Sequence, residues 1–74
     1  MDRSDFVASL RELRDDLIKN PHDWENPDLA SFLNAFASWV EDMDGYYRNC
    51  GQAVPEQPTW ATLIDMFEAA KVYE

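Results

Sequence analysis

The sequence predicts an all-α fold, a small three-helix bundle with a short extra helical turn after the central helix. In three segments apolar residues recur every three or four positions, which is the period of an amphipathic helix and not of a β-strand. Prolines lie between these segments, at positions 21, 27, 55 and 58, where they end one helix or precede the next. The 74 residues are expected to form a single domain, 1–74, near the lower end of what folds alone.

The first helix is predicted at about residues 5–19. Its apolar stripe consists of Phe6, Leu10, Leu13 and Leu17. Ser4 is the expected N-cap, because its hydroxyl can accept a hydrogen bond from an amide of the first turn. Asn20 and Pro21 end the helix, since a residue before proline avoids the α region. Trp24, in the connection that follows, is expected to fold back and fill the helix junction.

The second helix is predicted at about residues 27–44, with Asn26 as its cap and Pro27 in its first position. Its apolar residues are Leu29, Phe32, Leu33, Phe36, Val40 and Met43. Because this is the most apolar segment, we expect it to be the central helix of the bundle. The short connection before it favours antiparallel packing against the first helix.

Two glycines and a threonine mark the remaining boundaries. Gly45 costs about 1 kcal/mol relative to alanine inside a helix, so the second helix either breaks there or continues with a weak point, and its end is predicted at about residue 44. A separate turn then covers residues 46–48, and Gly51 is available for a left-handed C-terminal cap. Thr59 caps the third helix, predicted at about residues 59–73. The predicted core consists of Leu10, Leu13, Phe36, Val40, Leu63 and Phe67.

The formal net charge of −9 limits the classes of partner. A field of this sign repels phosphate groups, so we expect no binding to nucleic acid and none to an anionic membrane surface. No apolar run approaches the roughly 18 residues that span a bilayer, and the N-terminal sequence lacks the pattern of a signal peptide. Cys50 is the one cysteine, which excludes an intrachain disulfide and fits a reducing compartment. The sequence therefore predicts a cytoplasmic protein.

The stretch from Trp39 to Tyr47 is the best candidate for a working surface. Its candidate protein-binding residues are Glu41, Asp42, Asp44, Tyr46 and Tyr47. Adjacent tyrosines on a helix point about 100° apart, so they cannot share one buried face, and at least one is expected to be partly exposed. Tyrosine is enriched at interaction hot spots, and carboxylates attract basic partners. A solvated acidic face that serves only solubility remains the alternative.

The same carboxylates raise the question of a metal site, because Mg²⁺ and Ca²⁺ prefer oxygen ligands. Their spacing lacks the alternating ligands and the closing glutamate of an EF-hand loop. His22 and Cys50 are the only side chains of their kind, and no nucleophile–base arrangement can be built from them. We therefore expect no enzyme, no metal and no cofactor. A carboxylate-based metal enzyme remains an alternative.

Short motifs run through nearly the whole chain, from about Phe6 to the end. They are Trp24-Glu25-Asn26, Leu29 with Phe32-Leu33, Trp39, Glu41-Asp42-Met43-Asp44-Gly45-Tyr46-Tyr47, Pro58 with Trp60, and Ala69-Ala70-Lys71-Val72-Tyr73-Glu74. Through them the chain resembles a family of small, uncharacterised bacterial proteins, a domain of unknown function. The resemblance implies a helical, single-domain bacterial protein in which Glu74 is the natural C-terminus, and it implies no mechanism.

These observations favour a non-enzymatic protein-binding module whose acidic and aromatic residues meet a partner protein with a basic surface. An immunity or inhibitor protein is one concrete form, by analogy with small, acidic, helical proteins that bear exposed tyrosines. The alternative is a structural module that forms a homodimer or a larger homo-oligomer. A second copy would then cover apolar and aromatic surface that a chain of this size cannot bury alone.

Overall fold

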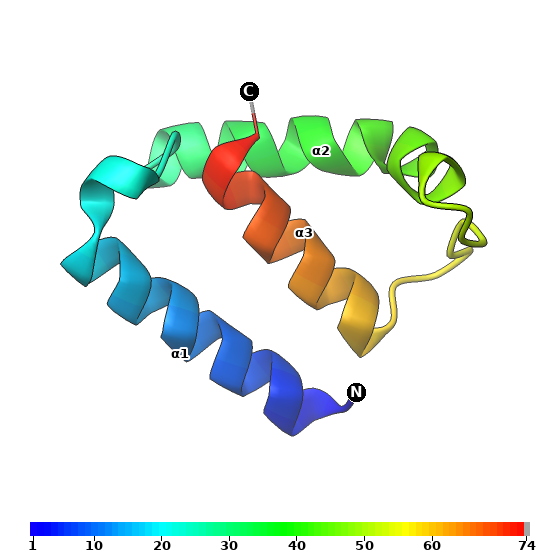
Figure 1. Ribbon diagram of the computed structural model, residues 1–74, viewed down its shortest axis with the longest axis horizontal. Coiled ribbons are helices and arrows are strands. Elements are labelled where there is room, and N and C mark those ends of the chain that lie inside the picture. Colours follow the sequence, from blue (N-terminus) through cyan, green and yellow to red (C-terminus); the bar gives the residue numbers. More distant parts are fainter. Residues whose placement is uncertain (74) are drawn as a thin grey trace.

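The computed structural model describes residues 1–73 of the chain, and within them the predicted all-α fold is confirmed. Helix α1 spans Arg3–Lys19, a single 3₁₀ turn spans Pro21–Asp23, α2 spans Leu29–Asn49 and α3 spans Trp60–Val72. Figure 1 shows α1 and α2 leaving a common corner in different directions, with α3 running between them. The three helices thus form a V, in which α1 and α2 are the two arms and α3 lies between them.

The central helix is α3, and the prediction that α2 would be central was wrong. Helix α3 packs against both α1 and α2, whereas α1 and α2 do not pack against each other. The expected antiparallel pairing of the first two helices is therefore wrong as well. Its physical cause is the connection between them, where the 3₁₀ turn and two prolines set α2 off at an angle to α1 (Figure 1).

Helix α1 begins two residues earlier than expected. Asp2 is its N-cap, in a capping box: the Asp2 carboxylate accepts from the Asp5 amide at 3.1 Å, and the Asp5 carboxylate accepts from the Asp2 amide at 2.9 Å. Ser4, the predicted cap, lies inside the first turn. The prediction for α3 is confirmed, because Thr59 accepts a hydrogen bond from the Thr62 amide at 3.1 Å.

Asn26 caps the end of α3 and not the start of α2. Its side-chain amide donates to the Ala70 carbonyl at 3.0 Å and to the Tyr73 carbonyl at 2.7 Å, and its backbone amide donates to the Lys71 carbonyl at 3.2 Å. The last carbonyls of a helix lack intrahelical partners, so these bonds stabilise the end of α3. The cap of α2 is Asp28, and the prediction of Asn26 in that role was wrong.

Helix α2 runs through Gly45, so the predicted break and the separate turn at residues 46–48 are both wrong. A Cβ placed on Gly45 would meet no atom within 4 Å, which means that no steric need explains the glycine. Its propensity cost of about 1 kcal/mol is outweighed because the two tyrosines after it pack on the body of the protein. The short extra turn is thus the last part of α2 itself.

The end of α2 forms a Schellman motif, as the predicted role of Gly51 requires. Gly51 has a φ of 70°, in the left-handed region that glycine adopts without steric cost. Its amide donates to the Arg48 carbonyl at 3.1 Å, and the Gln52 amide donates to the Tyr47 carbonyl at 2.9 Å. These bonds satisfy carbonyls that the helix leaves open.

The core lies between α2 and α3, nearer the second half of α2 than expected. Its buried centre consists of Trp39, Tyr47 and Met66. None of the six residues predicted as core is fully buried. Phe36, Val40 and Leu63 are half-buried against this centre, whereas Leu10, Leu13 and Phe67 line an open groove between α1 and α2.

Trp24 fills the corner of the V, as predicted. Its side chain is buried, and its Nε1 donates to Asp16 Oδ2 at 2.8 Å. Lys71 Nζ lies 2.7 Å from the same carboxylate oxygen and 5.5 Å from the centre of the Trp24 ring. Hydrogen bonds from Lys71, Trp24 and Asn20 lower the pKa of Asp16 to about 2. This cluster joins α1, the corner and the end of α3.

Candidate functional site

The structure divides the five predicted binding residues. Glu41, Asp42, Asp44 and Tyr46 are exposed on the second half of α2, whereas Tyr47 is only 4% exposed. The expectation that at least one tyrosine would be partly exposed is confirmed. The placement of Tyr47 among the surface residues was wrong, because its ring points into the core beside Trp39.

Tyr47 is buried beneath the exposed residues of α2 and joins this helix to α3. Its hydroxyl donates to Asp65 Oδ2 at 2.8 Å, which joins α2 to α3. Burial, together with this hydrogen bond and the negative charge of Asp65, raises the pKa of Tyr47 to about 12. The hydroxyl therefore stays protonated and continues to donate at all physiological pH values.

Tyr46 is the exposed aromatic of the set, with 46% of its surface accessible. Its ring centroid lies 5.5 Å from that of Trp39 and 5.1 Å from that of Tyr47, both in tilted or edge-on arrangements. Electrostatic interactions with the neighbouring Cys50 and with Asp65 raise the pKa of the Tyr46 hydroxyl. Two buried rings thus hold one exposed ring in a fixed position. We call Glu41, Asp42, Asp44 and Tyr46 the acidic–aromatic surface.

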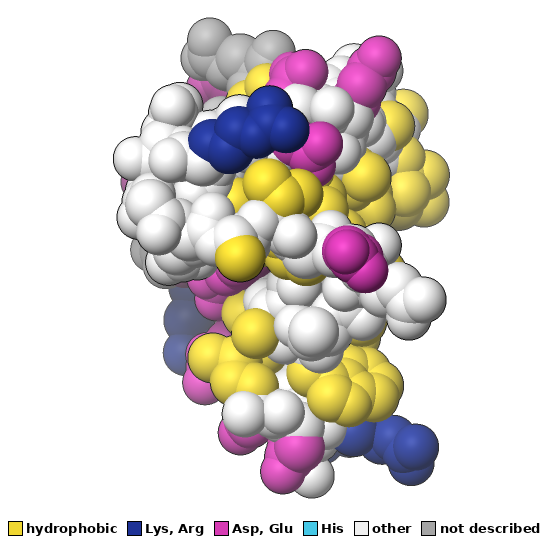
Figure 2. Space-filling model, turned by 90° about the vertical axis from the view of Figure 1, so that its right-hand side faces the viewer, with side chains coloured by type: hydrophobic (Ala, Val, Ile, Leu, Met, Phe, Trp, Pro, Cys, Tyr) yellow, Lys and Arg dark blue, Asp and Glu magenta, His cyan; other side chains and the backbone are white. Residues whose placement is uncertain are grey.

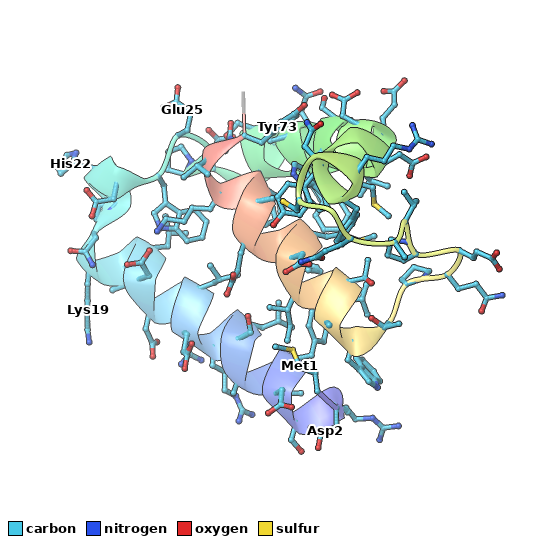
Figure 3. The ribbon with its side chains drawn as sticks, turned by 45° about the vertical axis from the view of Figure 1, so that its right-hand side comes forward. Met1, Asp2, Lys19, His22, Glu25 and Tyr73 are labelled. Atoms are coloured by element: carbon cyan, nitrogen blue, oxygen red, sulfur yellow. The ribbon has the colours of Figure 1, made fainter. Side chains whose placement is uncertain are left out.

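The three carboxylates of this surface differ in their contacts. Asp42 accepts a hydrogen bond from the Tyr73 hydroxyl at 2.5 Å, so it also fastens the end of α3 to α2, and this bond raises the pKa of Tyr73. Figure 3 shows Tyr73 beside α2. Within residues 1–73, the ion pairs join Arg14 to Asp15 and Lys71 to Asp16. Glu41 and Asp44 are exposed and form no ion pair there, so their charges face solvent.

Potential metal ligands and nucleophiles lie apart from one another in the described part of the chain. Among residues 1–73, no group of three or more histidine, cysteine or acidic side chains is placed to hold a metal ion. His22 points outward at the corner between α1 and α2 (Figure 3), and Cys50 is exposed at the end of α2. The two side chains thus lie at opposite ends of α2 and do not form a nucleophile–base pair.

The sequence interpretation missed an apolar groove between α1 and α2. It is an open cavity of about 290 Å³ with Phe67 of α3 among its lining residues. One wall comes from α1 and the other from the corner and the start of α2; the lining side chains are Leu10, Leu13, Arg14, Leu17, Trp24, Asn26, Pro27, Asp28, Leu29, Phe32 and Phe67. On the face that Figure 2 shows, at the open end of the V, hydrophobic side chains also reach the surface from top to bottom.

The family of the chain follows from a comparison with family models. One model, described as a family of unknown function, matches residues 2–74. The chain belongs to this family, DUF7660. The predicted membership of a small domain-of-unknown-function family is thus confirmed. Neither a curated protein nor a solved structure matches the chain. Within residues 1–73, no helix is long and apolar enough to cross a membrane.

Several residues on which the resemblance to a family of unknown function was based have structural roles in this chain. Trp24 fills the corner, Asn26 caps α3, Trp39 lies in the core and Tyr73 fastens α3 to α2. These residues therefore hold the three helices of the V together. One feature of the sequence did point to the groove: residues 29–40 contain no charged side chain, which is unusual for a helix that faces solvent.

Proposed function

We propose that this member of DUF7660 is a non-enzymatic protein-binding module of the bacterial cytoplasm. Its acidic–aromatic surface docks against a basic surface of a partner protein. The observation that carries the proposal is the exposed Tyr46 ring, which Trp39 and Tyr47 hold in place near Asp65 and Glu68 of α3. An exposed thiol at Cys50 agrees with a reducing compartment.

A ring held in this way favours tight binding. Ordering a free side chain at an interface costs about 0.5–1.5 kcal/mol, and a side chain already fixed by its neighbours avoids part of this cost. Tyrosine combines a large apolar area with a hydroxyl that can form a hydrogen bond at the edge of the contact. Tyr46 is therefore the expected anchor of the interface.

The charges around Tyr46 set the kind of partner. Between Lys19 and Arg48 the sequence has six acidic residues and no lysine or arginine, within a net charge of −9. Glu41 and Asp44 project this charge into solvent from the same half of α2 as Tyr46, and Asp65 and Glu68 of α3 line a hollow together with its ring. A negative field of this kind steers a basic protein toward the surface and speeds association at low salt. Neutralisation of a basic protein, as an immunity or inhibitor protein would achieve, is one concrete form of the proposed function.

Affinity capture from native cells, followed by a binding titration with the recovered protein, tests the proposal. Tyr46→Ala is expected to weaken binding about 30-fold, the effect of losing a hot-spot residue. Asp44→Lys should weaken it less and reduce its salt dependence. Glu56→Lys in the exposed connector before α3 makes the same charge change away from the surface and is expected to bind as the wild type does.

Two results would overturn this function. One is that a tagged chain recovers no basic protein from its own cells. The other is that Tyr46→Ala and Asp44→Lys bind the recovered protein as tightly as the Glu56→Lys control. In that second case the partner contacts another part of the molecule.

A further inference from the structure

The groove between α1 and α2 leaves unusual side chains in contact with water. Leu29, which lines the groove, is 72% exposed; Leu33, one turn further along α2 and outside the lining set, is 56% exposed. All four phenylalanines of the chain are only half-buried. Three of them meet Phe67, whose ring centroid lies 5.5 Å from Phe6, 4.9 Å from Phe36 and 6.1 Å from Phe32. The groove thus exposes part of what would be a hydrophobic core.

The exposed area matches what a protein interface covers. Folded monomers of 8.6 kDa expose about 4,700 Å² by the usual size relation, whereas this chain exposes 5306 Å². The excess is therefore roughly 600 Å². A specific interface buries about 600–1,000 Å² on each partner. Covering the groove once would bring the chain back to the surface area of an ordinary folded protein.

The charges at the groove are self-complementary. Its α1 wall carries Arg14 and its other wall carries Asp28, whose pKa is lowered by a hydrogen bond from the Ser31 amide. Among residues 1–73, the one ion pair of the exposed Arg14 is with its neighbour Asp15, at 2.9 Å. About a two-fold axis, Arg14 of each copy can face Asp28 of the other. The uncharged residues 29–40 let two chains of net charge −9 approach there.

We propose that a second copy of this chain covers the groove, in a two-fold symmetric dimer formed by α1 and the first half of α2. Such small domains gain from oligomerisation, because one chain alone buries little apolar surface. The acidic–aromatic surface lies on the second half of α2 and stays exposed. The dimer is thus independent of the proposed partner, and it presents that surface twice.

Sedimentation equilibrium of the full chain, from micromolar to submillimolar concentration, tests the dimer. The wild type is expected to reach twice the mass of one chain, with a micromolar dissociation constant. Leu29→Glu with Leu33→Glu should weaken dimerisation at least about 100-fold, because two buried leucines are lost from each copy. Arg14→Gln should weaken it by up to about 30-fold, because it removes both of the symmetric rim pairs with Asp28.

A matched control separates the groove from simple repulsion. Ala30→Glu with Asn34→Glu adds the same two charges at the same spacing, but turned by about 100° around α2, to exposed positions that do not line the groove. This variant is expected to dimerise like the wild type. Since Leu29 and Leu33 are exposed in the single chain, the groove variant should keep its helical circular dichroism.

Three results would overturn the dimer. If the wild type stays monomeric at the highest concentration, the proposed dimer does not form. A groove variant that dimerises as tightly as the wild type places the contact elsewhere, and an equal loss in the groove variant and its control shows that charge alone is responsible. None of these results bears on partner binding by Tyr46, so the two proposals fail separately.

Discussion

The two halves of α2 differ in a way that no single helix pattern predicts. Residues 39–49 bury Trp39 and Tyr47 against α3 and carry all the charges of the helix. Residues 29–38 carry no charge, yet they leave Leu29 and Leu33 exposed. The half with the charged side chains thus builds the centre of the core, whereas the uncharged half leaves two leucines in contact with water. An apolar stripe shows that a helix can bury one face, but not that anything in its own chain covers it.

The corner of the V explains the difference. Because the connection after α1 is short and holds Trp24 between the helices, α2 starts close to α1 and then moves away from it (Figure 1). Helix α3 fills the space at the second half of α2. At the first half, the space between α1 and α2 stays open on one side, which is the groove.

The largest expected effect comes from a substitution in residues 39–49, the half of α2 that packs on α3 (the closed half); residues 29–38 are the open half. Trp39→Ala should lower the free energy of unfolding by about 3–5 kcal/mol, because it leaves a cavity in the core. Leu33→Ala, on the open half of the same helix, should change it by less than about 0.5 kcal/mol. Urea unfolding at submicromolar concentration, below the dissociation constant proposed for the dimer, measures both. Equal losses would contradict the contrast between the two halves.

A milder change at the closed half tests the bond between α2 and α3. Tyr47→Phe should cost about 1–2 kcal/mol, since Asp65 loses its hydrogen-bond donor. The folded pKa of about 12 lies above the ordinary value of 10.0. This stabilisation is therefore complete below pH 10 and is lost as the pH rises through 12. Thermal unfolding across that range should show a steeper decline for the wild type than for Tyr47→Phe.

The glycines of α2 give a pair of opposite expectations. Gly45→Ala should raise the free energy of unfolding by about 0.5–1 kcal/mol, because the new methyl group meets no atom and the helix continues on both sides. Gly51→Ala should lower it by about 1–2 kcal/mol, because alanine is strained at a φ of 70°. Urea unfolding of the two variants measures both changes in the free energy of unfolding. A destabilising Gly45→Ala would show that α2 does break there.

The smallest effect concerns the corner. Asp16 has a folded pKa of about 2, below the ordinary value of 3.8, because Lys71, Trp24 and Asn20 donate to its carboxylate. Its contribution is therefore complete above pH 4 and is lost as the pH falls toward 2. Melting temperatures should fall less steeply in this range for Asp16→Asn than for the wild type. Parallel curves would mean that the carboxylate does not hold the corner.

Sequence periodicity was enough for the helices, for Trp24 at the corner and for the caps at Thr59 and Gly51. It failed where a local preference met a tertiary contact. Asn26 has a side chain suited to cap α2, but its amide instead donates hydrogen bonds to unpaired carbonyls at the end of α3. Gly45 favours a break, but the tyrosines after it pack well enough to continue the helix.

The candidate site could be predicted only in part for the same reason. The pair Tyr46 and Tyr47 indicated that one ring would be exposed, but only the position of α3 decides which one. The groove could not be predicted from apolar spacing, because Leu29 and Phe32 fit the pattern of a covered face. The missing charges in residues 29–40 were the one available sign.

Amide chemical shifts recorded during dilution test most directly whether the open half of α2 meets a second copy. Shifts that change with concentration are expected in residues 10–17 and 28–33, which line or flank the groove, and not in residues 41–48. Spectra that are identical at all concentrations would contradict the dimer. Changes centred on residues 41–48 would place the contact at the acidic–aromatic surface instead.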